Sequence, residues 1–410
     1  MEMFFSLNCI NIKLKLIEIR RKTLQIISSF NVPNINYFGV NSSSKVGKIA
    51  ENFHAKKALI VTDVNLPKVG VPDIIKYNLE ESGIEAEVWG GIHPNPRDYD
   101  VEAGVKFYNE GNFDIIVGVG GGSAMDGAKA IRIIVDNGGK ISDYEGVDKF
   151  EYRKTPLIEI ATTAGTSSEA NKLSVITNTQ IEGVLYKMGI SGWKVVADAS
   201  INDPLLTTTL DKFYTAGTGM DAFTHALEAI TSIDSTPFSD VMGYSAIKII
   251  SRWITTAVQE PNNIEARTNM MHAVLFAGLA FNTALLGISH SLAHPIGTYY
   301  DVHHGMSNAI ILPYVCRFNF NEAMDKLAMI AEAMGVDTSK MSTIEAANKA
   351  IDEIEKLLVE IDAPHKLSEL GVSKDKIERM SMDAYHDFCA GTNPRKATLE
   401  DFKTIYEAVI

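Results

Sequence analysis

Cysteine is scarce in this chain of 410 residues. Its three cysteines, Cys9, Cys316 and Cys389, lie far apart and form no CxxC pair. Such a set excludes a disulfide framework and predicts a reducing, cytoplasmic compartment. The chain also lacks an apolar run of about 18 residues, the length that a membrane-spanning helix needs, so we expect no membrane partner. Basic residues are outnumbered 38 to 51 by acidic ones, and the net charge of −13 excludes nucleic acid as a general partner.

The first 30 residues lack the order of a secretory signal. Their basic cluster, Arg20–Arg21–Lys22, comes late, and no small-residue cleavage site follows it. We interpret residues 1–30 as an extension ahead of the first domain. The remaining length exceeds one small core and predicts two domains.

The two predicted domains differ in their hydrophobic pattern. In residues 31–206, short β-branched runs alternate with amphipathic stretches, which predicts an α/β domain with a parallel, Rossmann-like sheet covered on both faces. The predicted strands are near 58–63, 85–90, 114–119 and 156–161, the helices near 69–82 and 98–110, and a possible antiparallel flap near 173–177. Residues 207–410 show helical periods and predict an all-α domain, with helices near 213–232, 237–258, 262–284, 321–335 and 342–360.

Histidines gather in the second predicted domain. Asp221 and His225 are four residues apart, which places both side chains on one face of a helix, and His290 and His294 repeat this spacing. One carboxylate with several imidazoles suits a first-row transition metal. The adjacent pair His303–His304 leaves open which of the two takes part.

A glycine run follows the predicted strand at 114–119. Gly120, Gly121 and Gly122 would let the backbone approach a phosphate, and we expect Ser123 to cap a helix whose N-terminus faces the anion. The run departs from the G-x-G-x-x-G fingerprint, and no suitable acid follows it by about 20 residues. Asp63, at the end of an upstream strand, is the candidate for the ribose hydroxyls. It would repel a 2′-phosphate, which favours NAD over NADP, although a simple turn role is equally open.

A hydroxyl-rich segment, Thr162–Thr163–Ala164–Gly165–Thr166, follows the strand near 156–161. It could line a cofactor cleft or form a turn and cap a helix. On its own, the segment favours the turn.

Together these segments resemble the iron-containing (group III) alcohol dehydrogenase family, from about Phe30 to the end of the chain. The motifs that carry the resemblance are Ala58–Asp63, Pro94–Pro96, Gly120–Asp126, Thr162–Thr166, Ile201–Pro204, Gly217–His225, His290–Gly297, His304–Gly305 and Thr392–Arg395. The resemblance implies a dehydroquinate synthase-like architecture, with a nicotinamide-binding α/β domain, a helical metal domain and catalysis between them.

The resemblance also implies roles for individual residues. It makes Asp221, His225, His290 and His304 the metal ligands, selecting His304 over His303, and it places His294 beside the substrate as a proton-relay candidate. The implied cofactor contacts are Asp63, Asn95, Gly121, Gly122, Ser123, Asp126, Thr162, Thr163, Thr166 and Lys187. Iron is implied by the family, and zinc is also compatible with these ligands. A small alcohol or aldehyde is the expected substrate, and a homodimer or larger homo-oligomer the expected assembly.

Three other functions stay open. The same architecture serves glycerol and glycerol-1-phosphate dehydrogenases, and dehydroquinate synthase, a lyase that uses NAD transiently. The spacing of Asp221 to His225 and the threonine segment favour the alcohol dehydrogenase branch. A non-enzymatic metal-binding scaffold fits least, because a scaffold needs no open metal position beside a glycine loop.

Overall fold

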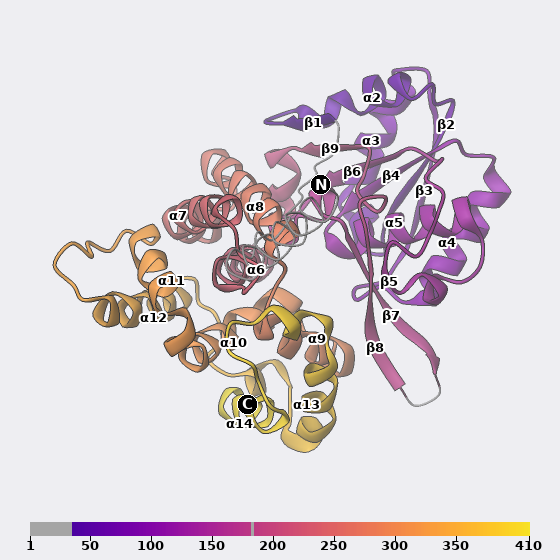
Figure 1. Ribbon diagram of the computed structural model, residues 1–410. Coiled ribbons are helices and arrows are strands. Elements are labelled where there is room, and N and C mark those ends of the chain that lie inside the picture. Colours follow the sequence, from indigo (N-terminus) through magenta and orange to yellow (C-terminus); the bar gives the residue numbers. More distant parts are fainter. Residues whose placement is uncertain (1–34, 182–183) are drawn as a thin grey trace, which may run out of the picture. The chain divides into compact units, whose positions relative to one another are not determined.

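The computed structural model describes residues 35–181 and 184–410 (Figure 1). The predicted extension at 1–30 and Cys9 lie outside the described residues. By their contacts, residues 31–410 group as one unit. The boundary that the sequence suggests between residues 206 and 207 therefore stays a prediction.

A parallel sheet of six strands organises the first half of the described chain. The strand order is β1-β9-β6-β4-β2-β3, and every pairing is parallel. The strands are β1 (Ile35–Phe38), β2 (Lys57–Asp63), β3 (Glu85–Ile92), β4 (Ile115–Gly120), β6 (Leu157–Ala161) and β9 (Ala199–Asn202). The parallel sheet predicted from the β-branched runs is confirmed.

Helices cover both faces of this sheet because alternate strand residues point to opposite sides. On one face, Ile60 of β2 shares a buried cluster with residues of α2 (Val46–Asn52) and α3 (Val71–Glu80). On the other face, Leu59 shares a cluster with α4 (Asp98–Gly111) and α5 (Gly122–Asn137). The glycine run thus lies at the carboxyl edge of β4, where α5 begins.

A smaller sheet of three strands stands beside this domain, in the order β5-β8-β7. Strands β7 (Leu173–Ile181) and β8 (Val184–Ser191) pair antiparallel, and β5 (Gly146–Val147) joins β8. The antiparallel flap predicted near 173–177 is confirmed. In the register of this hairpin Lys187 lies opposite Thr177.

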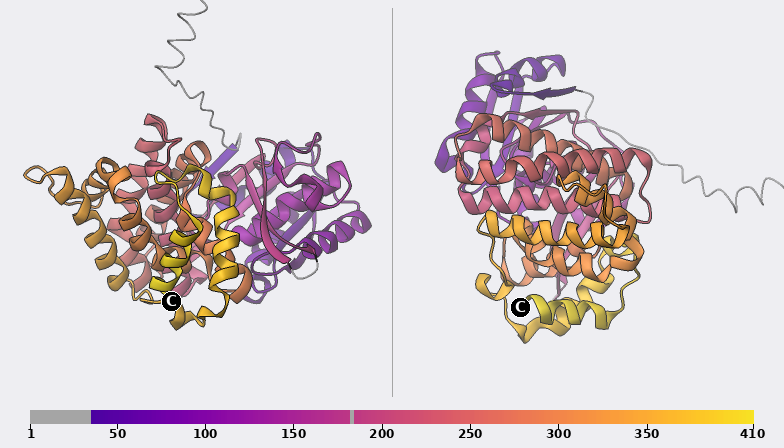
Figure 2. Two further views of the ribbon diagram at one scale, coloured as in Figure 1. Left: turned by 60° about the horizontal axis from the view of Figure 1, so that its bottom comes forward. Right: turned by 90° about the vertical axis from the view of Figure 1, so that its left-hand side faces the viewer.

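The second half of the chain is helical (Figures 1 and 2). Its helices are α6 (Lys212–Thr231), α7 (Pro237–Gln259), α8 (Ile264–Ala284), α9 (Ile288–Tyr300), α10 (His304–Phe318), α11 (Phe320–Ala333), α12 (Thr343–Glu360), α13 (Ile377–His386) and α14 (Leu399–Val409). They share one large buried core built mainly of alanine, isoleucine and leucine. Within the described residues no single helix is long and apolar enough to cross a membrane, and α8 with α9, bent by 106°, meets that test only as a pair.

Candidate functional site

Three helices carry the predicted metal ligands. Helix α6 starts at a cap in which the side chain of Asp211 accepts from the Tyr214 amide at 2.9 Å, and almost all of its residues from 215 onward are buried. Asp221 and His225 lie one turn apart on it. Helix α9 contributes His290, and α10 begins at His304. The pattern of buried positions on α6 therefore brings two polar ligands into an apolar core.

The ligand atoms of three of these residues converge. Oδ1 of Asp221 lies 3.7 Å from Nε2 of His290 and 3.7 Å from Nε2 of His304. One ligand atom from each of the three lies within 4.8 Å of the others. His225 is outside this group, but its ring stacks on His290 with centroids 4.6 Å apart. We call Asp221, His225, His290 and His304 the histidine cluster.

His303, the neighbour that spacing alone leaves as a candidate, is used differently. Its Nδ1 accepts from the Met306 amide at 3.3 Å, so it caps α10. Its ring packs edge-on against Tyr214. The structure therefore directs His304, rather than His303, to Asp221.

Burial keeps two of the imidazoles neutral. It lowers the pKa of His225 to about 4 against the opposing charge of Asp221. Burial, with the nearby ammonium of Lys187, also holds the pKa of His304 well below its usual range. Neutral imidazole is the form that ligates metals. For His290, burial alone would lower the pKa, but Glu228 outweighs it and raises the value.

Three further residues, which the sequence did not predict, hold the histidine cluster and His294 in place. Glu228 lies 2.5 Å by Oε2 from Nδ1 of His290, which directs Nε2 of that ring toward Asp221. The amide of Asn308 donates to Oδ1 of Asp221 at 2.9 Å. Asp387 holds Nδ1 of His294 at 2.7 Å. Two of them leave a sequence signal: Glu228 shares a helical face with 221 and 225, and Asn308 lies one turn after His304 on α10.

The cluster has the properties of a site for a divalent metal. Nδ1 of His225, Nε2 of His290 and Nδ1 of His304 are buried, and no hydrogen-bond partner faces them among the described residues. Buried polar atoms without a partner are costly and point to a missing ligand. A carboxylate with imidazoles is a donor set that iron or zinc accepts. The residues present therefore fit the metal that the family resemblance implies.

Most predicted cofactor residues line the same pocket as the histidine cluster. This pocket has a volume of about 140 Å³, and four predicted residues do not line it: Asp63, Gly121, Thr162 and Thr163. The pocket does contain Asn95, Gly122, Ser123, Asp126, Thr166, Lys187, His294 and the whole histidine cluster. Glycine loop and histidines are thus brought together from segments far apart in the chain.

Asp63 serves a turn at the edge of the sheet. Its Oδ1 accepts from the amides of Asn65 at 2.8 Å and Leu66 at 3.0 Å. Its Oδ2 lies on the side of Gly120, where a Cβ would come within 3.5 Å. The turn role left open by the sequence is therefore present, and one oxygen remains directed toward the glycine loop.

The prediction that Ser123 caps α5 is wrong. The helix begins at Gly122, Gly121 takes the N-cap position in an extended conformation, and no side chain caps it. Ser123 consequently lies inside the first turn and lines the pocket. Gly122 is required for packing, because a Cβ there would meet Cγ2 of Thr166 at 2.7 Å.

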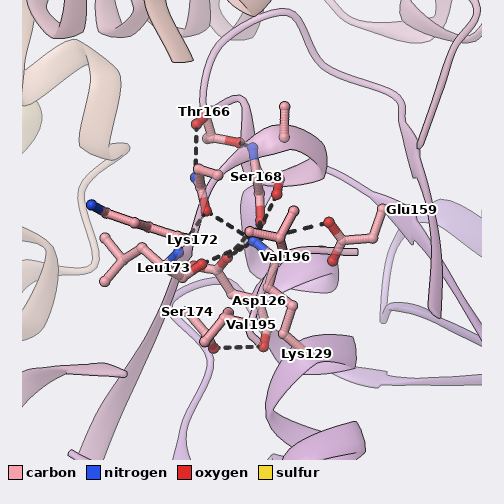
Figure 3. A network of polar contacts seen from close by, with 12 residues as sticks. Asp126, Lys129, Glu159, Thr166, Ser168, Lys172, Leu173, Ser174, Val195 and Val196 are labelled. Atoms are coloured by element: carbon pink, nitrogen blue, oxygen red, sulfur yellow. Dashed lines mark hydrogen bonds and ion pairs between the residues drawn. The ribbon is translucent and has the colours of Figure 1, made fainter. Parts of the chain in front are cut away.

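A buried ammonium ties α5 to residues 168–173, which follow the threonine segment (Figure 3). Nζ of Lys129, fully buried, lies 2.6 and 2.8 Å from the carbonyl and hydroxyl oxygens of Ser168. It also lies 2.9 Å from both Oδ1 of Asn171 and the carbonyl of Leu173. Asp126 and Glu159 are 3.7 and 3.9 Å away. We call this set the lysine network: Lys129, Asp126, Glu159, Ser168, Asn171 and Leu173.

A chain of hydrogen bonds also crosses the pocket. Nζ of Lys187 donates to Oδ1 of Asn95 at 2.8 Å, and Nδ2 of Asn95 donates to Asp301 at 2.9 Å. Asp301 caps the end of α9, the helix that bears His290. Burial lowers the pKa of Lys187 to about 8, opposed by the charges of Asp126 and Asp221. The hairpin, the β3–α4 loop and α9 thus meet at the pocket.

Comparison with known proteins covers nearly the whole chain. Residues 33–204 match the family model described as iron-containing alcohol dehydrogenase, and residues 215–410 match the C-terminal model of the same family. The chain is 41% identical to 1,3-propanediol dehydrogenase from Klebsiella pneumoniae over 92% of this chain and 97% of the relative. It is 37% identical to the NAD-dependent methanol dehydrogenase of Bacillus methanolicus over 92% of this chain and 99% of the relative. The crystal structure of a 1,3-propanediol oxidoreductase superposes with a TM-score of 0.91 at 40% identity, covering 94% of this chain and all of that one.

Proposed function

The chain belongs to the iron-containing alcohol dehydrogenase family, and we propose that it transfers a hydride between a small primary alcohol or diol and NAD. The proposal rests on one juxtaposition: the converging atoms of Asp221, His290 and His304 face a pocket that also contains the glycine loop. Oxidation of the alcohol gives its carbon hydride to the nicotinamide and its hydroxyl proton to solvent. The products are the aldehyde, NADH and one proton.

Asp221, His225, His290 and His304 would hold the metal, with iron as the first choice and zinc as the second. A bound divalent metal supplies Lewis-acid polarisation, which lowers the pKa of an alcohol hydroxyl. Glu228 orients His290 for this task through the contact at Nδ1. The free ring nitrogen of that histidine then faces Asp221.

His294 is the proposed proton carrier. Its Nδ1 donates to Oδ2 of Asp387 at 2.7 Å, which leaves Nε2 as an acceptor. Burial alone would raise the pKa of Asp387, but His294 outweighs it and the value lies below the usual range. The ionised carboxylate therefore stabilises the imidazolium that forms when Nε2 takes the proton.

NAD is preferred over NADP in this proposal. Asp63 keeps one carboxylate oxygen directed toward the glycine loop, where a negative charge disfavours a 2′-phosphate. The NAD dependence stated for the methanol dehydrogenase relative supports the same choice. The cytoplasmic location and the homo-oligomeric assembly stay predictions.

The test is a substrate panel on metal-free protein reconstituted separately with Fe²⁺ and Zn²⁺. We expect NADH formation, followed by absorbance, with 1,3-propanediol or short primary alcohols, and a lower kcat/KM with NADP. Activity should follow the metal content. Equal turnover by the metal-free protein, or no turnover of any alcohol or aldehyde with metal and NAD both bound, would overturn the proposal.

A further inference from the structure

A second cavity of about 320 Å³ lies beside the pocket of the histidine cluster. On this measure one water needs roughly 10–15 Å³, so the cavity has room for an organic group. It is bounded by the hairpin β7–β8, by β5 and by the end of α8. Five residues line both spaces: Leu173, Phe281, Leu286, Phe388 and Cys389.

These five residues form a wall between the two spaces, and two of their rings lie close to the histidines of the proposed reaction centre. The ring of Phe281 lies 4.6 Å from that of His225, and the ring of Phe388 lies 5.7 Å from that of His294, measured between centroids. The wall is mostly apolar, so it suits the hydrocarbon part of a substrate. A substrate that reacts beside these histidines and extends into the second cavity would pack against this apolar wall.

Lys172 is the one cation that lines the second cavity. Within the described residues its ammonium makes no hydrogen bond and no ion pair within 4 Å; it lies over the ring of Trp193, 4.7 Å from the centroid. Burial lowers the pKa of Lys172, and the exposed Asp148 opposes that shift. A partly buried ammonium that no described carboxylate contacts within 4 Å attracts an anion.

Two other polar side chains of the cavity, Glu145 and Asn282, are already engaged. Oε2 of Glu145 accepts from the hydroxyl of Tyr186 at 2.8 Å. Asn282 accepts from the Lys172 amide at 3.1 Å and donates to the Ala170 carbonyl at 2.8 Å. Lys172 is thus the strongest donor that remains available to an occupant.

We propose that the second cavity holds the distal end of the substrate and that Lys172 binds a carboxylate there. The preferred substrates are then ω-hydroxycarboxylates and the corresponding aldehyde acids. This inference rests on the proposed alcohol dehydrogenase activity and adds to it the substrate class. Lys172 acts in binding and lies away from the reacting atoms.

The test compares kcat/KM of the metal-loaded, full-length enzyme for ω-hydroxycarboxylates and for 1-alkanols of equal chain length. We expect at least a tenfold preference for the acids. Lys172→Met should lower kcat/KM for the acids about 10- to 100-fold, mainly through KM, because a charge-assisted hydrogen bond is lost. The alkanols should change less than twofold, and Lys172→Arg should keep the preference.

Two more variants distinguish the effect of the cavity volume on turnover from the effect of the Lys172 charge. Lys154→Met is the matched control, because Lys154 also lies over an aromatic ring, that of Tyr152, and lines neither cavity; it should change nothing. Ser191→Trp should fill the second cavity and reduce turnover of long acids and long alkanols alike, while ethanol is spared. Circular dichroism and melting temperature verify that each variant is folded.

The outcomes are distinct. Unchanged acid turnover in Lys172→Met, or no preference for acids in the parent enzyme, overturns the assignment of the carboxylate. Unchanged turnover of long substrates in Ser191→Trp overturns the assignment of the cavity. In both cases short alcohols are still oxidised; if no alcohol is oxidised at all, the proposed function itself fails.

Discussion

Two buried groups of charged and polar side chains meet at the pocket, the lysine network and the histidine cluster. They differ in whether their polar atoms have hydrogen-bond partners within the protein. In the lysine network, every hydrogen of the Lys129 ammonium has an acceptor within the protein, with four oxygens at 2.6–2.9 Å. Asp126 in turn accepts from the Ser168 hydroxyl at 2.6 Å and from the Val175 amide at 3.0 Å. Around the ammonium the network is closed on itself and belongs to the fold, and among its members only the Glu159 carboxylate lacks a donor.

The histidine cluster is open. Its side chains are anchored from behind, by Glu228 at His290 and by Asn308 at Asp221. Nδ1 of His225, Nε2 of His290 and Nδ1 of His304 have no partner among the described residues, while Nε2 of His304 lies 3.2 Å from Nδ2 of Asn308. Burying polar atoms costs free energy in both groups. Only the histidine cluster leaves ring nitrogens that can bind a ligand from outside the protein. The contrast separates a binding site from a structural polar core.

The largest expected effect comes from breaking the open cluster. His290→Ala removes one converging ligand and leaves Glu228 without its imidazole. We expect the bound metal to be lost and kcat to fall by at least about a hundredfold, since Lewis-acid stabilisation is worth several kcal/mol. Metal analysis and initial rates on the purified variant measure both effects together.

His272→Ala is the control for that variant. His272 stacks on Phe38 with centroids 3.7 Å apart and is not part of the cluster. It should retain the metal and most of the activity. A His290→Ala protein that keeps full metal content, or turns over normally without metal, would contradict the open cluster as the metal site.

A smaller effect, on stability rather than chemistry, is expected from breaking the closed network. Lys129→Met removes the ammonium donor from four oxygens and leaves Asp126 without its nearest cation. Removing one partner of a buried ion pair costs roughly 3–5 kcal/mol, so the free energy of unfolding should fall by about 3 kcal/mol. Urea denaturation of metal-loaded protein gives this value.

The matched control is Lys48→Met. Its ammonium pairs with Glu51 at 2.7 Å, but both side chains are exposed. An exposed pair is worth less than about 1 kcal/mol. If Lys129→Met cost no more than Lys48→Met, the lysine network would be a dispensable contact rather than part of the structural core.

The sequence predicted the central elements of the fold and lost accuracy at its edges. Strands β2, β4 and β6 and helices α6, α7 and α8 lie within a few residues of the expected ranges, because their apolar periods are long. The edge strand β1 and its neighbour β9 have only four residues each. Helices α9 and α10 contain Pro295 and Pro313, and because proline is unusual inside a helix, these segments are harder to recognise as helices from the sequence.

Local spacing predicted a helical face with Asp221 and His225, and the family resemblance, not spacing, selected His304 over His303. Asp221, His290 and His304 do converge, and the family resemblance drawn from the motifs is confirmed. Asp387 lies 93 residues from the histidine that it holds, and Asn308 lies 87 from Asp221. Such pairs depend on tertiary packing, which no local pattern reveals. The roles assigned to the individual residues stay predictions until the variants are measured.

The last prediction concerns the pH dependence of stability and tests the one unsatisfied member of the lysine network. Glu159 is fully buried, both of its oxygens lack a donor, and burial raises its pKa to about 8 against the opposing charge of Lys129. The folded protein therefore keeps a proton on Glu159 that the unfolded chain releases above its ordinary pKa of 4.5. The contribution of Glu159 to the free energy of unfolding is fully present below pH 4.5 and is lost as the pH rises from 4.5 to about 8.

Glu159→Gln isolates that contribution, because all other titrating groups are common to both proteins. The difference in unfolding free energy, parent minus variant, should fall with pH by at most about 1.4 kcal/mol per unit and level off above pH 8. Denaturation at a series of pH values measures the slope. A flat difference from pH 6 to 8 would mean that Glu159 is ionised and forms a true ion pair with Lys129. The lysine network would then be held by charge as well as by hydrogen bonds, and the contrast with the open histidine cluster would become greater.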